Sequence, residues 1–233
     1  AKTIRKQAVL VRVCFGFVGN RMFFPYVREA QRMILEGNAP EYIDKVAYDW
    51  GMAMGPNGVS DLSGLDVLDK VNNEWKQKPN DPAYCRMVAK LTEMGRLGQK
   101  TNAGIFKYVD RKPVPDPEVA ALAKAEAERL GVPQIAVTPE EVIERLLFSM
   151  INEGALILEE GIALRASDID MVYLTGYGFP LHRGGPMCYA DTLGLYNVAQ
   201  AMKRFAANPN DDAEFWQPAP LLARLVAEGK SFS

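Results

Sequence analysis

The sequence predicts a mainly α-helical protein that contains two tandem copies of one helical unit. Three observations lead to this prediction. Apolar residues recur at helical spacing through most of the chain, typical helix-start and helix-stop residues flank these stretches, and a set of residues repeats in the same order. With 233 residues, the chain is long enough for one or two domains and a sizeable buried core.

The first half of the chain is expected to form four helices. Apolar residues lie along one face over residues 20–37, and a proline favours a helix start over residues 40–50. After the Gly55-Pro56 turn, a third helix is predicted over residues 62–71, and Asp-Pro opens a fourth over residues 81–94.

The middle of the chain interrupts this pattern. Residues 95–108 are rich in glycine and polar side chains and predict a loop that ends in a short extended piece. The proline-rich residues 112–117 predict a linker, because proline fixes φ and has no backbone N–H to donate. Alanine and glutamate then favour a helix over residues 118–130.

The second half returns to helices. Thr138-Pro139-Glu140-Glu141 has the spacing of a capping box and opens a long helix that ends at Gly161. Ser167 and Asp170 indicate the start of the next helix, and the tail ends in a helix that reaches Glu228.

Residues of the first half recur in the second half. A shift of 124 takes Arg21, Phe24, Glu29, Glu36 and Gly37 to Arg145, Phe148, Glu153, Glu160 and Gly161. A shift of 126 takes Ile43, Asp44 and Val46 to Ile169, Asp170 and Val172. A shift of 130 takes Gly55-Pro56, Asp61 and Gly64-Leu65 to Gly185-Pro186, Asp191 and Gly194-Leu195.

We interpret this repeat as a duplication, since its period is far too long for a solenoid. The predicted organisation is a first repeat over residues 14–110, a proline-rich linker and helix over 111–137, and a second repeat over 138–233. Two copies in one chain suggest a pseudo-dimer with approximate two-fold symmetry. The copies differ where Asn20-Arg21 of the first becomes Glu144-Arg145 in the second.

The composition excludes several classes of protein. A formal net charge of −2 and a pI of about 5.6 argue against a nucleic-acid binder. No apolar run is long enough to span a membrane. A single histidine, His182, excludes a metal site built on two or three imidazoles, and the three distant cysteines argue against a structural zinc site. Three scattered thiols suit a reducing compartment.

Few residues point to chemistry by themselves. The chain lacks the G-x-G-x-x-G dinucleotide fingerprint and the phosphate-binding P-loop motif. Asn20 has two interpretations: an N-cap of its helix, which the residues alone favour, or a ligand contact at the helix N-terminus. Arg96 and Lys100 invite a phosphate-binding interpretation against that of a solvated loop, and His182 is interpreted as structural or exposed.

Several stretches together resemble the C-terminal domain of 3-hydroxyacyl-CoA dehydrogenases. In the first half these are GFVGNRMFFPY at residues 16–26, MGPNGVSDLSGLD at 54–66 and GRLGQKTNAGIF at 95–106. In the second half, EGALILEEG at 153–161 and GYGFPLHRGGP at 176–186 resemble the second copy found in multifunctional fatty-acid oxidation enzymes. The resemblance covers essentially the whole chain, in order.

The resemblance implies NAD-dependent oxidation of a 3-hydroxyacyl-CoA to a 3-ketoacyl-CoA in fatty-acid β-oxidation. In the family, a Rossmann domain binds NAD and carries a catalytic His–Glu pair, and a hydratase/isomerase module precedes it in the multifunctional members. Of the family's active-site residues, only the asparagine of the N-R motif maps onto this chain, at Asn20. The resemblance therefore makes Asn20 the expected catalytic residue, with Arg96 and Lys100 as candidate contacts to CoA phosphates.

This chain carries neither the glycine fingerprint nor a histidine that matches the catalytic one. We therefore expect it to be inactive alone and to bind no cofactor itself, as a part of a longer enzyme. The alternative is a stand-alone, non-catalytic acyl-CoA-binding or assembly module, and a third option is the helical domain of another 3-hydroxyacid dehydrogenase family. The final residues differ from the S-K-L peroxisomal signal, so a cytoplasmic protein is expected, with a peroxisomal one as the alternative.

Overall fold

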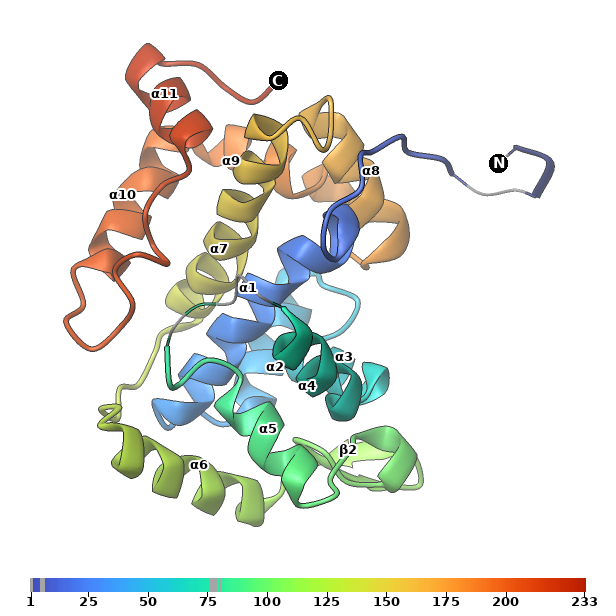
Figure 1. The fold of residues 1–233 in the computed structure, drawn as a ribbon, viewed down its shortest axis with the longest axis vertical. Coiled ribbons are helices and arrows are strands. Elements are labelled where there is room, and N and C mark those ends of the chain that lie inside the picture. The colour runs from blue at the N-terminus through green and yellow to red at the C-terminus, as the bar shows by residue number, and fades with distance from the viewer. Residues whose placement is uncertain (1, 5–6, 76–78, 80) are drawn as a thin grey trace. The chain divides into compact units, whose positions relative to one another are not determined.

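The computed structural model describes residues 2–4, 7–75, 79 and 81–233 (Figure 1). Within these residues the protein consists of α-helices, short 3₁₀ turns and one two-stranded antiparallel ribbon, which confirms the predicted mainly α fold. The α-helices are α1 (Phe17–Leu35), α2 (Pro40–Trp50), α3 (Pro56–Ser63), α4 (Leu65–Glu74), α5 (Arg86–Glu93), α6 (Pro117–Leu130), α7 (Pro139–Glu159), α8 (Ala166–Gly176), α9 (Pro186–Leu193), α10 (Leu195–Ala206) and α11 (Pro220–Glu228). The strands are β1 (Lys107–Val109) and β2 (Lys112–Val114), and the 3₁₀ turns are η1 (Lys2–Ile4), η2 (Gln99–Thr101) and η3 (Leu181–Arg183).

The chain folds into two compact units that are discontinuous in sequence. Unit 1 comprises Ala1–Tyr26, Gly51–Ala53 and Glu144–Ser233, and unit 2 comprises Val27–Trp50 and Met54–Ile143. Unit 1 therefore combines the first turns of α1 with the helices of the second half of the chain. These units describe packing, whereas the repeat boundaries 14–110, 111–137 and 138–233 describe the sequence and stay a prediction.

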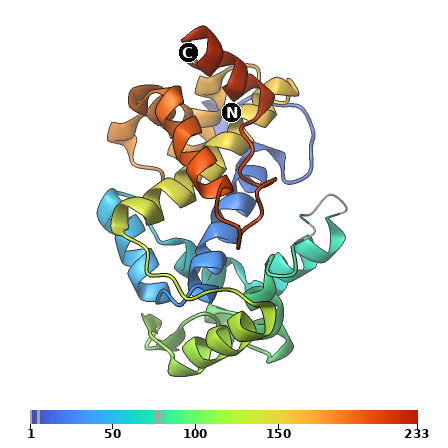
Figure 2. The same cartoon turned by 90° about the vertical axis from the view of Figure 1, so that its left-hand side faces the viewer.

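In unit 1, α9 packs against α8 and α10, and α11 packs along α10 (Figure 2). The tail between α10 and α11 places the fully buried Trp216 against the ring of Phe205, with ring centroids 4.8 Å apart. Asn152 of α7 fixes the same tail, because its side chain donates to Gln217 O (2.9 Å) and accepts from Ala219 N (2.7 Å).

In unit 2, α2 packs on α3 and α4 packs on α5, around a core that includes Ile43, Met87 and Leu91. The loop that follows α5 leads into the ribbon, where Tyr108 lies opposite Pro113. After the ribbon the chain enters α6, whose first turn is capped by Asp116, which accepts from Glu118 N (3.1 Å).

One hydrogen-bond arrangement occurs at the same place in both copies of the repeat. Asp44 of α2 accepts from the backbone N–H groups of Asn57 (2.9 Å) and Gly58 (2.8 Å) at the start of α3. Asp170 of α8 accepts from Met187 (2.8 Å) and Cys188 (3.3 Å) at the start of α9. These donors are related by the shift of 130, so the duplication seen in the sequence extends to the hydrogen bonds.

The same contact explains why a glycine precedes the proline in both copies. A Cβ atom on Gly55 would lie 2.2 Å from Cγ of Asp44, and one on Gly185 would lie 2.4 Å from Cβ of Asp170. Any side chain at these positions would displace the carboxylate from the helix N-terminus, where unsatisfied N–H groups and the helix dipole favour an anion.

A second pair of aspartates that the repeat relates accepts hydrogen bonds from backbone N–H groups later in the chain. Asp61 accepts from the N–H groups of Ile105 (2.8 Å) and Phe106 (3.0 Å) in unit 2. Asp191 accepts from Phe232 (2.8 Å) and Ser233 (3.1 Å) in unit 1. Each carboxylate thereby satisfies two backbone donors of a segment about forty residues further along the chain.

Two predicted helices differ from the structure. The helix expected over residues 62–71 is two helices, because Gly64 has a φ of 97° and ends α3 just before α4 begins. The helix expected from Asp81 begins only at Arg86. The Asp81 carboxylate accepts from Ala83 N (2.9 Å), which stabilises a local turn instead of a helix start.

The expected proline-rich linker is partly a strand. Lys112–Val114 pairs with Lys107–Val109, and Pro113 is tolerated because a two-stranded ribbon leaves the outer edge of each strand without a partner. The other expectations nearby are confirmed. Pro117–Leu130 forms α6, and Thr138 Oγ1 accepts from Glu141 N (3.2 Å) at the start of α7, as a capping box requires.

The repeated aspartates predict a pH effect on stability. Burial raises the pKa of both Asp44 and Asp170 to about 6, against an ordinary 3.8. A raised carboxyl pKa contributes stability that is present below about pH 4 and is lost as the pH rises through about 6. In Asp170→Asn this loss is absent. From about pH 4 to pH 7, the variant should therefore gain up to about 3 kcal/mol in unfolding free energy relative to the wild type.

Urea unfolding of the wild type and the variant at both pH values measures this difference. Asp44→Asn is the matched variant from the other copy and should shift in the same direction. A difference between wild type and Asp170→Asn that stays constant from pH 4 to pH 7 would contradict the prediction.

Candidate functional site

Asn20 lies in the first turn of α1 and is exposed. The helix begins at Phe17, three residues earlier than predicted, after Gly16 with a φ of 73°. Asn20 is therefore inside the helix, and its interpretation as the N-cap is wrong. Its side-chain oxygen accepts a hydrogen bond from the Tyr177 hydroxyl instead (2.6 Å).

Two tyrosines of the second half, Tyr173 and Tyr177, contact this first turn within unit 1. Tyr173 of α8 is buried, and its hydroxyl donates to Gly19 O (3.0 Å). The Tyr173 and Tyr177 rings stack with centroids 4.9 Å apart, and the Phe23 ring is 6.5 Å from that of Tyr177. Asn20 thus lies at the surface of unit 1, next to a group of packed aromatic rings.

Arg21, the next residue, ties the same turn to α7. Its Nε donates to Glu153 (2.6 Å), and Nη1 and Nη2 donate to the two oxygens of Glu160 (2.6 and 2.8 Å). Burial raises the pKa of Glu153, whereas the hydrogen bond from Arg21 lowers the pKa of Glu160. The bidentate pair with Glu160 and the bond to Glu153 together fix the rotation of α1 about its axis.

Arg96 is buried, 7% exposed, and its guanidinium contacts acceptors of the protein. Nε and Nη2 donate to Gly104 O (3.1 and 2.9 Å), Nη2 also donates to Asp116 (2.6 Å), and Nη1 donates to Glu118 (3.0 Å). This geometry favours a structural role for Arg96, in which it joins the loop before the ribbon to the start of α6, over the predicted contact with a phosphate.

Lys100 and His182 are more accessible. Lys100 lies in η2 and pairs with Asp66 of α4, with about half of its side chain exposed. His182 lies exposed in η3. Arg96 and Lys100 belong to unit 2, whereas Asn20 belongs to unit 1, so the predicted site residues are not members of one compact unit.

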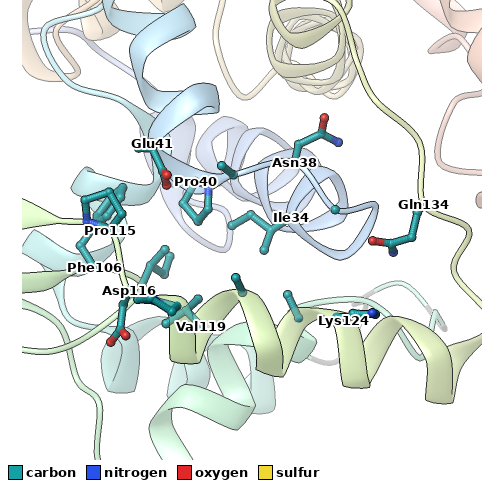
Figure 3. Close-up of a pocket in the computed structure, with 16 residues that line it drawn as sticks. Ile34, Asn38, Pro40, Glu41, Phe106, Pro115, Asp116, Val119, Lys124 and Gln134 are labelled. Atoms are coloured by element: carbon teal, nitrogen blue, oxygen red, sulfur yellow. The ribbon is translucent and has the colours of Figure 1, made fainter.

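A pocket of about 390 Å³ lies in unit 2 between α6 and the turn that joins α1 to α2 (Figure 3). Apolar side chains such as Ile34, Phe106 and Val119 line it. At its edge, Gln134 Nε2 donates to Leu35 O (2.9 Å) and so serves to hold the chain between α6 and α7. The pocket has the size of a small-molecule site, but Asn20, Arg96 and Lys100 are not among its lining residues.

The described part of the chain has neither a candidate metal cluster nor a helix that could span a membrane. No cluster of three or more His, Cys, Asp or Glu side chains is placed to hold a metal ion there. Among the helices of residues 2–4, 7–75, 79 and 81–233, none combines the length and the apolar character that crossing a membrane requires.

The family resemblance named Asn20 as a candidate, but sequence reasoning did not name Tyr177 as one. The motif that contains this tyrosine, GYGFP at residues 176–180, stands out in the sequence. Its contact with Asn20 joins residues 157 positions apart, and neither helical periodicity nor the repeat relates the two.

The family described as "3-hydroxyacyl-CoA dehydrogenase, C-terminal domain" matches two segments of the chain, residues 16–108 and 142–231. The match to two segments agrees with the duplication found in the sequence and in the aspartate hydrogen bonds.

Known proteins are similar over nearly the whole chain. The peroxisomal bifunctional enzyme of Danio rerio is 41% identical over 243 residues, and that of Homo sapiens is 38% identical over 250 residues. Each alignment covers 98% of this chain and 34% of the relative, so the chain spans about a third of these proteins.

Solved structures give the same result. The dehydrogenase part of multifunctional enzyme 1 from C. elegans is similar with a TM-score of 0.72 and 31% identity, over 96% of this chain and 50% of that one. The 3-hydroxybutyryl-CoA dehydrogenase of Escherichia coli K12 is similar with a TM-score of 0.73 and 21% identity, over 96% and 62%. The second likeness supports the fold alone.

The structural interpretation of Arg96 predicts a loss of stability. Arg96→Ala leaves the buried carboxylate of Asp116 without its main partner and Gly104 O without its donors. We expect the free energy of unfolding to fall by about 3–5 kcal/mol, measured by urea denaturation. Lys100→Ala, which breaks an exposed ion pair, is the control and should leave the unfolding midpoint unchanged. Wild-type stability of Arg96→Ala would contradict this interpretation.

Proposed function

Because the chain belongs to the family of the 3-hydroxyacyl-CoA dehydrogenase C-terminal domain, we propose that it is the helical part of an NAD-dependent 3-hydroxyacyl-CoA dehydrogenase of fatty-acid β-oxidation. In the complete enzyme this part would complete the substrate site for conversion of a 3-hydroxyacyl-CoA into a 3-ketoacyl-CoA. The names of the relatives support this proposal, as does the likeness to the dehydrogenase part of a multifunctional enzyme.

The observation that carries the proposal is the presentation of Asn20. Its amide lies exposed on the first turn of α1, and its oxygen is occupied by Tyr177. The Nδ2–H₂ group is then the donor available to a ligand. During oxidation, negative charge develops on the substrate oxygen as its proton leaves, and a fixed amide donor would stabilise that charge.

The described residues do not fit NAD. They contain one two-stranded antiparallel ribbon and no parallel sheet that leads through a glycine-rich turn into a helix, which is the arrangement that cradles a dinucleotide. We therefore assign the hydride acceptor and the general base to other parts of the complete enzyme, and the role of this chain to substrate positioning.

The names of the relatives also bear on the cellular compartment that we propose. The relatives from Danio rerio and Homo sapiens are named as peroxisomal, and that from Brassica napus as glyoxysomal. These names favour a peroxisomal location, the alternative considered above, over a cytoplasmic one.

The isolated chain should not form NADH from NAD and 3-hydroxybutyryl-CoA, because hydride transfer requires a positioned nicotinamide and a general base. NADH absorbance measures the reaction, with the complete enzyme at equal concentration as the positive control. If the purified chain, free of any other dehydrogenase, forms NADH, the assignment of the hydride acceptor and the general base to other parts of the enzyme is refuted.

In the complete enzyme, Asn20→Ala should lower kcat/KM by roughly 10- to 1,000-fold, because a donor to the developing charge is lost. Asn20→Asp keeps the acceptor for Tyr177 but lacks the NH₂ donor, and it should be impaired to a similar degree. Asn73→Ala, which removes an exposed asparagine from α4, is the control. Unchanged kinetics of Asn20→Ala would remove Asn20 from the site.

A further inference from the structure

The ring of Tyr177 lies directly on the backbone of α1 at Gly19. A Cβ atom on Gly19 would lie 2.2 Å from Cε2 and 2.3 Å from the hydroxyl oxygen of Tyr177. Any residue other than glycine would therefore push the ring away. The absence of a side chain at Gly19 is what allows the Tyr177 hydroxyl to reach Asn20.

Other contacts leave this ring little freedom. Tyr173 stacks on one side, with its own hydroxyl bound to Gly19 O, and the Phe23 ring packs nearby. Tyr177 itself is half-buried, and its backbone N–H donates to Tyr173 O (3.2 Å) as α8 ends. The position of the hydroxyl is thus set by the end of α8 and by the stacked tyrosine.

An asparagine amide has two faces of opposite chemistry, since the oxygen only accepts and the nitrogen only donates hydrogen bonds. The Tyr177 hydroxyl donates to Oδ1 of Asn20 at 2.6 Å, and within the described residues Nδ2 makes no hydrogen bond. After a rotation of the amide by half a turn, Nδ2 could donate to the phenolic oxygen, but Oδ1 would then face the ligand, where developing negative charge requires a donor. With Oδ1 bound to the Tyr177 hydroxyl, the NH₂ group is the one that faces the ligand.

We propose that Tyr177 is a positioning residue for the reaction assigned above: its hydroxyl fixes the Asn20 amide so that Nδ2 points its hydrogens toward the substrate oxygen. This inference rests on the proposed function of Asn20. Burial raises the pKa of Tyr177, so the hydroxyl keeps its proton and its role as a donor through the neutral range. The substrate class is an acyl-CoA thioester with oxygen at C3.

The test is a double-mutant cycle in the complete enzyme. Tyr177→Phe removes the hydroxyl and keeps the ring, and it should lower kcat roughly 3- to 10-fold with little change in KM, since a donor to the transition state is less well oriented. In the Asn20→Ala background the same substitution should have no further effect, because there is no amide left to orient. Tyr196→Phe, at an exposed tyrosine of α10, is the control.

The outcomes separate this inference from the proposal on which it depends. If the effects of Tyr177→Phe and Asn20→Ala multiply, Tyr177 does not act through Asn20 and the inference is wrong, while the role of Asn20 stands. If Asn20→Ala retains full activity, the proposed function of Asn20 fails first. An unchanged kcat in Tyr177→Phe also overturns the inference.

A second measurement covers the case in which Tyr177→Phe is impaired by misfolding. In the ¹⁵N-labelled 233-residue chain, Tyr177→Phe should shift the side-chain NH₂ resonances of Asn20. Those of Asn73, which binds Asp69 on α4, should stay in place. Asn20 resonances identical to the wild type would show that the hydroxyl does not orient the amide, whatever the activity.

Discussion

The presentation of the candidate site depends on the hydrogen bonds of Arg21. This guanidinium joins the first turns of α1 to Glu153 of α7 and to Glu160, which directly follows α7, and it uses all three of its nitrogens. Burial of Glu153 would be costly without a charged partner, and a lysine could not contact both carboxylates with the same planar geometry. Because α1 is fixed in this way, the side chain of the neighbouring Asn20 has a defined position, in which it accepts a hydrogen bond from Tyr177.

The two copies of the repeat share structural contacts but differ at the candidate site. Asp44 and Asp170 cap equivalent helices, and Gly55 and Gly185 make room for them. The position equivalent to Asn20, however, holds Glu144, which pairs with Arg204 of α10. A carboxylate bound to a cation cannot offer an N–H donor, so only the first copy presents an amide here. The two copies thus share the aspartate hydrogen bonds at the start of α3 and α9 and differ at the position of Asn20.

The role of Arg96 illustrates what a local sequence pattern leaves open. A glycine-rich loop with arginine and lysine was interpreted as either a phosphate contact or a solvated loop, and the sequence did not indicate internal hydrogen bonds. The structure favours this third role, because the guanidinium donates to Gly104 O and Asp116 in the interior of unit 2. Asp116 comes twenty residues later, beyond the ribbon, and no local pattern relates it to Arg96.

By itself the sequence determined the mainly helical fold and the duplication, because periodicity, capping residues and repeated Gly-Pro turns are local signals. Asn20 was named through the resemblance to a family, whereas local signals favoured it as an N-cap. The sequence placed α6 and the capping box of α7 correctly, and it missed the break at Gly64 and the strand at Lys112–Val114. Only the tertiary structure decided what surrounds Asn20. Tyr177 is 157 residues away in the sequence, and its hydroxyl contacts Asn20 only because Gly19 has no side chain. Such a contact depends on the packing of helices that are distant in the chain.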